Sequence, residues 1–486
     1  MAKRMWQWAA GTWLVAMAWS AGLSGGAQAA VKARAPVAAA TAPTSSAGTS
    51  PGGGVSGQSG CIEAGTQALD RASEQASHQH LGDAAGDPMQ QLQGLVREAN
   101  RRSAEVGAAR LLADATEFDL SELQASRKPR VTLFGSAAYG LTQQTGRPDA
   151  TGVQGNVGLN VSAPLFDGGR LDALDTWRKR LSEAARQGQG ATSERVALEA
   201  VYTALERHRY RLQAQIYQQY ARKMGCLVEA LDIIVSEDKG RASELVQARK
   251  SRRQAEIQRE QAMATARQFE TRLRKLVGEQ VQLGEGFSTV LMSTPALDEV
   301  QRLIERSAEL QRLQSEADAQ QAYAQAVATG NTPQVNWTVG ESVSKLPGSR
   351  TSSLSLGVQF SWQLYDGGGV DAATRAALKR AEAYRQNRQE ALQARMSQVA
   401  QQHDTAVSAF DRARRHAEVM RDSDRVRNFT FQQWSQLGRR SLFDVMSAES
   451  DHFNQRVSYI NALVDGAQAN ASLRSQGLGL IQWVGP

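Results

Sequence analysis

The chain has 486 residues, of which only 6% are aromatic, and its formal net charge is +7. Its abundance of Ala, Gln, Arg and Glu favours long helices over a compact β or α/β core. The arginines are interleaved with Glu and Gln, so the positive charge indicates solvated helix faces and argues against a nucleic-acid partner.

The first 29 residues have the features of a secretory signal. Lys3 and Arg4 precede an apolar run over residues 6–23, and small residues at 27–29 provide a cleavage site. The short run disfavours the alternative, a signal anchor. Residues 30–86 are predicted to be a disordered, low-complexity leader, rich in Ala, Pro, Ser, Thr and Gly.

Later in the sequence, no segment approaches the ~18 consecutive apolar residues of a membrane helix. Entry into a membrane would therefore require strands. The chain contains only Cys61 and Cys226, which excludes a framework of several disulfides.

Proline spacing divides the rest of the chain into two copies of one plan. Prolines are absent from residues 165–294 and 348–485, and several precede each of these stretches. Because proline breaks helix interiors but is tolerated at helix starts, loops and strand ends, this spacing predicts an internal duplication. We place the first repeat at residues 87–285 and the second at 286–486.

Each copy opens with a predicted helix of about 35 to 40 residues, beginning at Pro88 or Pro295. Apolar and polar side chains then alternate, which predicts two strands per copy, at residues 131–142, 153–162, 335–340 and 353–364. The second strand of each copy reaches the ~9 to 11 residues with which a tilted strand crosses a bilayer. A soluble sheet packed on helices would alternate in the same way; the export signal and the lack of another core favour the membrane.

A repeated phrase marks the end of each second strand: "SAPLFDGGRLDAL" at 162–174 and "SWQLYDGGGVDAA" at 361–373. The glycines let the backbone turn, and the aspartate before them can accept hydrogen bonds from the first N–H groups of a helix. Phosphate binding is disfavoured, because no Lys-Ser/Thr pair and no βαβ unit follow. The predicted strand-to-helix junction residues are Pro164, Asp167, Gly168, Gly169, Asp366, Gly367 and Gly368.

Residues 172–236 and 371–435 lack proline and carry apolar residues at intervals of three and four. At 1.5 Å per residue, each would form a helix of ~100 Å with coiled-coil packing. Turns at 236–243 and 435–441 lead into predicted returning helices. His208 and His403 fall on the apolar stripes with no second ligand four residues later, so we expect seam histidines and no metal site.

In this order of elements the chain resembles the TolC-like outer membrane efflux proteins. The resemblance rests on the duplicated junctions, on "GRASELVQA" at 240–248 and on "LGRRSLFDVMSAESDHFNQRVSYINALVDGAQANASL" at 437–473. The sequence departs from the family at Gln363, where the first copy has Pro164, and in its long leader. The resemblance implies a mixed α/β membrane protein. Three chains, each giving four strands, would form a twelve-stranded outer-membrane β-barrel continued by a periplasmic α-helical coiled-coil barrel.

The same resemblance implies a bacterial outer-membrane location and the contacts of such a protein. These are outer-membrane lipid, a periplasmic adaptor and an inner-membrane transporter, for which the turns favour the ABC type. No cofactor is expected. The residues implied to dock the adaptor are Gly240, Arg241, Gly438, Arg439 and Ser441. The residues implied to form the periplasmic gate are Ser243, Glu244, Arg440 and Asp444, with Glu244 and Asp444 as an acidic ring and Arg440 linking to the Ser243 hydroxyl. The alternative is a surface ion pair of Arg440 with Asp444 on one helix face.

We therefore expect a passive export duct that carries secreted, toxin-like protein in a type I system. Small-molecule or multidrug efflux is the alternative cargo. A surface coiled-coil adhesin is the weaker alternative, because strands interrupt both copies instead of forming one terminal domain. No nucleophile–base pair, zinc spacing or paired carboxylates stand out in the sequence, so no enzymatic activity is expected.

Overall fold

The structure is a computed structural model that describes residues 87–143, 150–279, 284, 286–347, 349–436 and 439–485. The predicted signal peptide (1–29) and leader (30–86) lie outside the described residues, as does Gly438. Within the described part of the chain, no helix is both long enough and apolar enough to cross a membrane.

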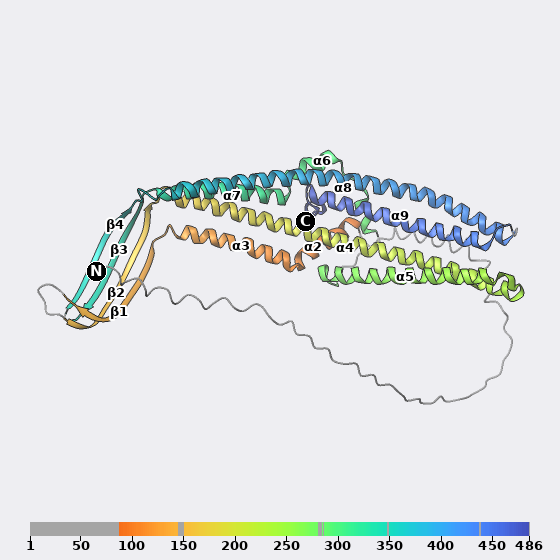
Figure 1. Cartoon of the computed structure of the whole chain (residues 1–486), viewed down its shortest axis with the longest axis horizontal. Coiled ribbons are helices and arrows are strands. Elements are labelled where there is room, and N and C mark those ends of the chain that lie inside the picture. The colour runs from red at the N-terminus through yellow and green to blue at the C-terminus, as the bar shows by residue number, and fades with distance from the viewer. Residues whose placement is uncertain are drawn as a thin grey trace, which may run out of the picture. The chain divides into compact units, whose positions relative to one another are not determined.

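The same order of elements occurs twice (Figure 1). The first set comprises α2 (Pro88–Arg102), α3 (Ala104–Ala125), β1 (Arg130–Thr142), β2 (Ala150–Phe166), α4 (Arg170–Glu237), the 3-10 turn η1 (Lys239–Arg241) and α5 (Ala242–Val277). The second comprises η2 (Phe287–Met292), α6 (Leu297–Leu303), η3 (Ile304–Arg306), α7 (Ala308–Ala328), η4 (Thr329–Asn331), β3 (Gln334–Leu346), β4 (Ser349–Ser361), α8 (Gly369–Ser435), α9 (Leu442–Gln476) and α10 (Leu480–Val484).

The opening helix of each copy is interrupted. Ser103 has an extended backbone (φ −67°, ψ 115°), and its hydroxyl accepts a hydrogen bond from the Val106 amide at 3.3 Å, so it caps a new helix. In the second copy, Ser307 is also extended (φ −63°, ψ 142°) where α7 begins. The prediction of one continuous helix from Pro88 or Pro295 is therefore wrong.

The long helices are present as predicted. α4 has 68 residues and α8 has 67, so each extends about 100 Å at 1.5 Å per residue. α5 packs along α4, and α9 packs along α8, which gives two helical hairpins (Figure 1). α4 also contacts α7 and α9, so it joins the two copies.

The four strands form one antiparallel sheet in the order β1-β2-β3-β4. β2 pairs with β3 and so joins the two copies, with an irregularity between Pro164 and Phe166. β1 and β4 are the edge strands. One row of apolar side chains crosses all four strands in register: Val131, Val161, Val339 and Leu356.

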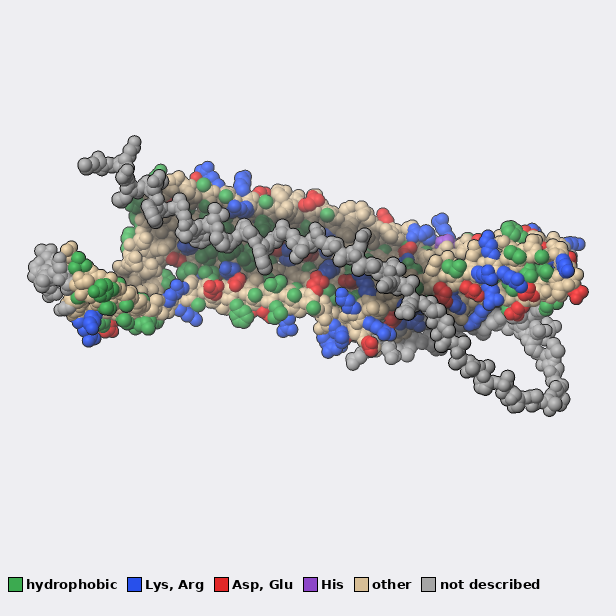
Figure 2. Space-filling model, turned by 60° about the horizontal axis from the view of Figure 1, so that its bottom comes forward, with side chains coloured by type: hydrophobic (Ala, Val, Ile, Leu, Met, Phe, Trp, Pro, Cys, Tyr) green, Lys and Arg blue, Asp and Glu red, His purple; other side chains and the backbone are tan. Residues whose placement is uncertain are grey.

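The two faces of the sheet differ in polarity. On the apolar face, Val131 is 63% exposed and Leu356 is 81% exposed, so the described chain leaves this face open. On the opposite face, Ser344 donates to Asn156 at 3.3 Å, and the Ser342 and Ser353 hydroxyls lie 3.0 Å apart. Figure 2 shows basic and acidic side chains mingled over the helices, whereas the strands present mainly hydrophobic and uncharged groups.

The largest buried core lies where α4 passes α2 and α9. It contains Leu95 of α2, Leu205 of α4, Val464 of α9 and Phe287 of η2. The carboxylate of Glu194 on α4 accepts a hydrogen bond from the Ile481 amide at 3.2 Å and so holds α10 against this core. Both copies therefore contribute to one core midway along α4.

Candidate functional site

The turn between α4 and α5 brings four of the predicted site residues together. Asp238 organises the turn, because its Oδ1 accepts a hydrogen bond from the Gly240 amide at 2.9 Å. Arg241 forms an ion pair with Glu244, in the first turn of α5, at 3.0 Å. Ser243 is exposed beside them.

The turn between α8 and α9 is fixed by a capping box. The Ser441 hydroxyl accepts from the Asp444 amide at 3.2 Å, and the Asp444 carboxylate accepts from the Ser441 amide at 3.1 Å. Gln433, near the end of α8, holds the preceding residues. Its side-chain oxygen accepts from Arg440 Nε at 3.2 Å, and its carbonyl accepts from the Arg439 amide at 3.0 Å.

The alternative expected from the sequence, an ion pair of Arg440 with Asp444 on one helix face, is wrong. Arg440 precedes α9 and bonds Gln433, whereas Asp444 lies in the first turn of α9 and bonds Ser441. The two side chains therefore do not share one helix face. Nor does the described part of the chain join Arg440 to Ser243, which lies on α5. A link between these two residues would have to form between chains.

Apolar packing holds the two turns at the same end of the helices. Met224 of α4, Leu245 of α5 and Val445 of α9 belong to one buried cluster, against which Phe431 and Trp434 of α8 pack. We call this group of residues the tip cluster. All four helices thus converge behind the predicted gate.

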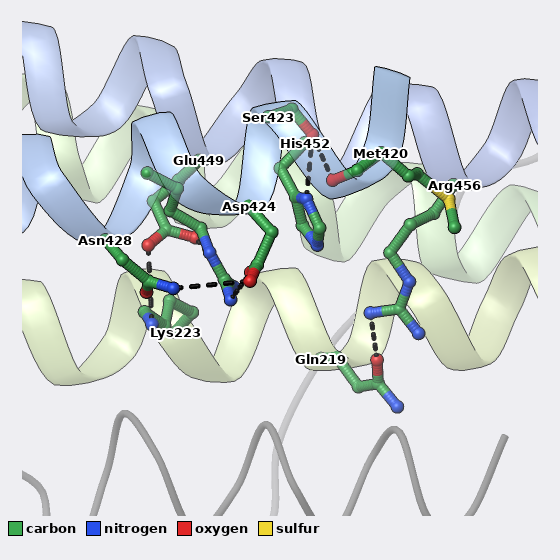
Figure 3. Close-up of polar contacts among 10 residues, drawn as sticks. Gln219, Lys223, Met420, Ser423, Asp424, Asn428, Glu449, His452 and Arg456 are labelled. Carbon is green, nitrogen blue, oxygen red and sulfur yellow. Dashed lines mark hydrogen bonds and ion pairs between the residues drawn. The ribbon is translucent and has the colours of Figure 1, made fainter. Parts of the chain in front are cut away.

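A buried group of charged residues adjoins the tip cluster, and the sequence analysis missed it (Figure 3). Glu449 of α9 has a side chain only 1% exposed, and it pairs with Lys223 of α4 at 3.3 Å and with Arg427 of α8 at 3.7 Å. Arg427 is 4% exposed and also pairs with Asp424, one turn earlier on α8. We call these four residues the ionic cluster.

A signal for the ionic cluster was present in the sequence. Glu449 follows Val445 by four residues and precedes Phe453 by four, so it lies on the buried stripe of α9. Charged side chains are almost never fully buried unless they are paired. A glutamate on an apolar stripe therefore predicts a buried cationic partner, although it does not identify which one.

His452 lies beside the ionic cluster. Its Nδ1 is 3.0 Å from the hydroxyl of Ser423 on α8. Burial and the nearby guanidinium groups of Arg427 and Arg456 lower its pKa from 6.5 to about 4. The ring is therefore neutral at pH 7. No group of His, Cys, Asp and Glu suited to a metal ion occurs among the residues that the structure describes.

The two strand-to-helix junctions have the same geometry. Asp167 accepts from the Leu171 amide at 2.6 Å, and Asp366 accepts from the Val370 amide at 2.6 Å. Because the Val370 and Gly368 amides bond its carboxylate, the pKa of Asp366 is lowered. The glycines after each aspartate have positive φ, which side chains disfavour: Gly168, Gly169, Gly367 and Gly368.

Comparison with known proteins agrees with this architecture. Residues 300–476 match the family model described as "Outer membrane efflux protein". A search of curated proteins finds no match. Among solved structures, CusC is 17% identical with a TM-score of 0.71, over 80% of this chain and 92% of that one. VceC of Vibrio cholerae gives 15% and 0.69, over 80% and 97%. The Campylobacter jejuni CmeC outer membrane channel gives 15% and 0.70, over 80% and 86%.

Proposed function

The chain carries an outer membrane efflux protein domain and has the fold of the TolC-like channels, and from this premise we propose that three copies form an exit duct in the bacterial outer membrane. The strands cross the outer membrane, and the helices extend into the periplasm. The duct is a passive conduit that catalyses no reaction. An adaptor and an inner-membrane transporter supply the coupling to energy.

The open sheet is the observation that carries this proposal. Four strands cannot enclose an aqueous channel, and β1 and β4 leave unpaired backbone groups at the edges. Joining β1 of one copy to β4 of the next would pair these groups, as a bilayer requires. Three copies would then give a twelve-stranded barrel, with its apolar face toward lipid and its Asn- and Ser-rich face toward water.

The charges on the apolar face agree with this orientation. Lys345 and Arg350 are paired next to the β3–β4 turn, beyond the apolar rows. Glu341 lies further along β3, opposite Leu159 and Leu354. Acidic side chains cost less than basic ones on the lipid face of a barrel, and every charge costs less near the interface.

The helices also leave surfaces for neighbouring copies. Within the chain, α3 contacts α4, α4 contacts α7, and α7 contacts α8. These four helices therefore form a row with α3 and α8 at its two ends. Leu111 and Phe118 of α3 are 69% and 75% exposed. α8 exposes small residues, among them Ala376 and Ala383, and also the larger Leu378, which is 51% exposed. Exposed apolar side chains on both outer helices suit knobs-into-holes packing between copies.

We place the gate at Ser243, Glu244, Arg440 and Asp444. The position of both turns at one end of the helices supports this, because three copies would bring these residues around one opening. Carboxylates around a narrow aqueous opening favour cations. We place the adaptor contacts on the same turns, at Gly240, Arg241, Gly438, Arg439 and Ser441.

For cargo we favour secreted protein, exported through an ABC-type transporter, because the turns "GRASELVQA" and "GRRSLFDV" resemble those of type I secretion partners. Small-molecule efflux is the second candidate. An adhesin is disfavoured, because the strands lie inside both copies. Deletion of the gene separates the two cargoes: loss of a secreted protein with unchanged drug susceptibility supports the first, and the reverse supports the second.

Planar lipid bilayers test the duct itself. We expect the purified protein to insert and to form water-filled pores that conduct small ions. Absence of conductance in protein that has inserted into the bilayer would overturn the proposal.

A further inference from the structure

One side of α4 faces neither of the two helices that pack along its second half. Lys223 and Tyr220 contact α9. Asp232 and Tyr210 contact α5. Because successive residues are about 100° apart around a helix, these positions occupy two sides of α4 and leave a third. We call this third side the open side of α4, and its exposed residues are Arg211, Gln215, Arg222, Glu229 and Ile233.

A cysteine lies on the open side and is already bonded. Cys226 follows Arg222 by four residues and precedes Ile233 by seven, and it is part of a disulfide. The chain contains one other cysteine, Cys61, which belongs to the leader. The sequence predicts export, and disulfides form and persist outside the cytoplasm. Within one chain, Cys61 is therefore the only partner that Cys226 can have.

The leader joins the described chain near the same side of α4. Asp87 opens α2, where its carboxylate accepts a hydrogen bond from the Met89 amide at 3.0 Å. Met89 packs against the core that contains Phe287, whose ring lies 5.9 Å from that of His208 on α4. His208 precedes Cys226 by five helical turns, so it lies on the same side of α4, about 27 Å away at 1.5 Å per residue.

The chain between Cys61 and Asp87 is long enough to cover this distance. It has about 26 residue steps and could reach up to about 85 Å at ~3.3 Å per residue. A span of about 27 Å therefore leaves the segment free to turn and to follow the surface of the helix.

The composition of the leader changes at Cys61. Residues 30–60 contain no acidic residue, whereas residues 62–86 contain four acidic residues, one arginine and several apolar side chains, among them Ile62 and Leu69. The open side of α4 offers two exposed arginines for carboxylates and the apolar Ile233, which is 59% exposed. Residues 62–86 therefore suit this surface, and residues 30–60 do not.

We propose that Cys61 and Cys226 form a disulfide within one chain and that this bond holds residues 62–86 along the open side of α4. Asp87 fixes one end of the segment and the disulfide fixes the other, so docking is intramolecular and needs no strong contact of its own. Only residues 30–60 then remain a free leader. Reduction of the bond releases the segment and uncovers this side of the helix. The inference does not depend on the function as a duct.

Peptide mapping tests the bond. The mature protein is purified without reductant, and its free thiols are alkylated. Trypsin should give peptides 35–71 and 224–239 as one linked species, which separates on reduction. On a non-reducing denaturing gel the protein should migrate as a single chain. Alkylation of both cysteines, or a dimer that reduction dissociates, would overturn the proposal.

The rate of trypsin cleavage in detergent tests whether the segment is docked. Arg71 lies inside the segment, and Arg34 lies in the free leader and serves as the internal control. In the parent, cleavage after Arg71 should be at least roughly tenfold slower than after Arg34, because a docked segment must detach before a protease can cut it. Cys61→Ser and Cys226→Ser should each remove this difference.

The two variants separate the tether from local packing around Cys226. Cys61→Ser changes only the leader, so an effect that it shares with Cys226→Ser, and that the double variant does not exceed, comes from the bond. An effect of Cys226→Ser alone would overturn the proposal. Equal cleavage rates at Arg71 and Arg34 in the parent would also overturn it, because solvent or another copy of the chain would then lie against the open side of α4.

Discussion

At the scale of single residues, the carboxylates of Asp444 and Glu449 lie five positions apart on α9 and have different roles. Asp444 lies in the first turn of α9, where its oxygens accept hydrogen bonds from the Ser441 amide and hydroxyl at the exposed turn. Glu449 points into the protein and depends on cations from two other helices. Asp444 can therefore contact an ion at the turn, whereas Glu449 contacts only its buried partners.

The gate assignment predicts separable effects on conduction. Arg440→Ser removes the guanidinium that we propose to link to Ser243 of a neighbouring copy, so the resting conductance should rise. Asp444→Asn retains a side-chain oxygen that can accept from the Ser441 amide in the capping box while removing the charge, so cation selectivity should fall with α9 intact. Both are measured by single-channel recording. If both variants conduct like the parent while the trimers remain intact, the gate lies elsewhere.

His452 makes the stability of the fold depend on pH. Its pKa is about 4 in the folded chain and ordinary, near 6.5, when unfolded, so below pH 6.5 the unfolded state takes up a proton that the folded state resists. The free energy of unfolding should therefore fall between pH 6.5 and 4, by up to roughly 3 kcal/mol per chain. His452→Gln should flatten this part of the curve, as measured by denaturant unfolding. Identical pH dependence in parent and variant would contradict the assignment.

At the scale of elements, the sequence predicted what depends on local chemistry. The proline-free stretches gave α4 and α8 within a few residues, and the alternating patterns gave the strands. Ser103 and Ser307 interrupt the opening helices without proline or glycine, so no breaker marked them in advance. A serine is as common inside a helix pattern as at its cap, and tertiary packing decides between the two.

Contacts between elements that are distant in the chain could not be predicted from the sequence. The side chains that bond across α4 and α9 are more than two hundred residues apart, as for Gln213 and Asn461. Each side chain alone is typical of a solvated helix face. The gate residues were identified by resemblance, and the predicted turn at 435–441 already placed Arg440 before the returning helix. That position is set by the capping box of Ser441 and Asp444.

We expect the adaptor to bind the two hairpin turns, α4–α5 and α8–α9. Reversing two charges with Arg241→Glu and Arg439→Glu should leave trimers in the membrane but abolish export, because both arginines lie at the tips. Arg425→Glu, at an exposed position on α8 away from the turn, is the matched control. Export is measured in cells that lack the parent gene. Normal export by the double variant would show that docking uses other residues.

Exposed apolar residues on α3 should hold neighbouring copies together. Leu111→Arg with Phe118→Arg places charges on the exposed stripe, so association should weaken at least roughly tenfold while the single chain still folds. Arg110→Glu lies beside the stripe and serves as the control. The fraction of trimers is measured by size-exclusion chromatography in detergent. Full assembly of the double variant would remove α3 from the interface.

At the scale of the whole molecule, the proposed trimer in a bilayer accounts for the surfaces that one chain leaves open. The sheet has two open edges and an uncovered apolar face, and the outer helices α3 and α8 both expose apolar side chains. In the proposed trimer, strands would join edge to edge and helices would pack side to side around one axis. The proposed trimer would pair the strand edges and pack the helix surfaces, while the apolar face of its sheet would lie against lipid.

The number of chains in the native particle tests this account most directly. Native mass spectrometry of the mature protein, extracted from the outer membrane in detergent, should give a mass three times that of one chain. A monodisperse, water-soluble monomer would contradict the account, because four strands alone can neither close a barrel nor hide an apolar face from water.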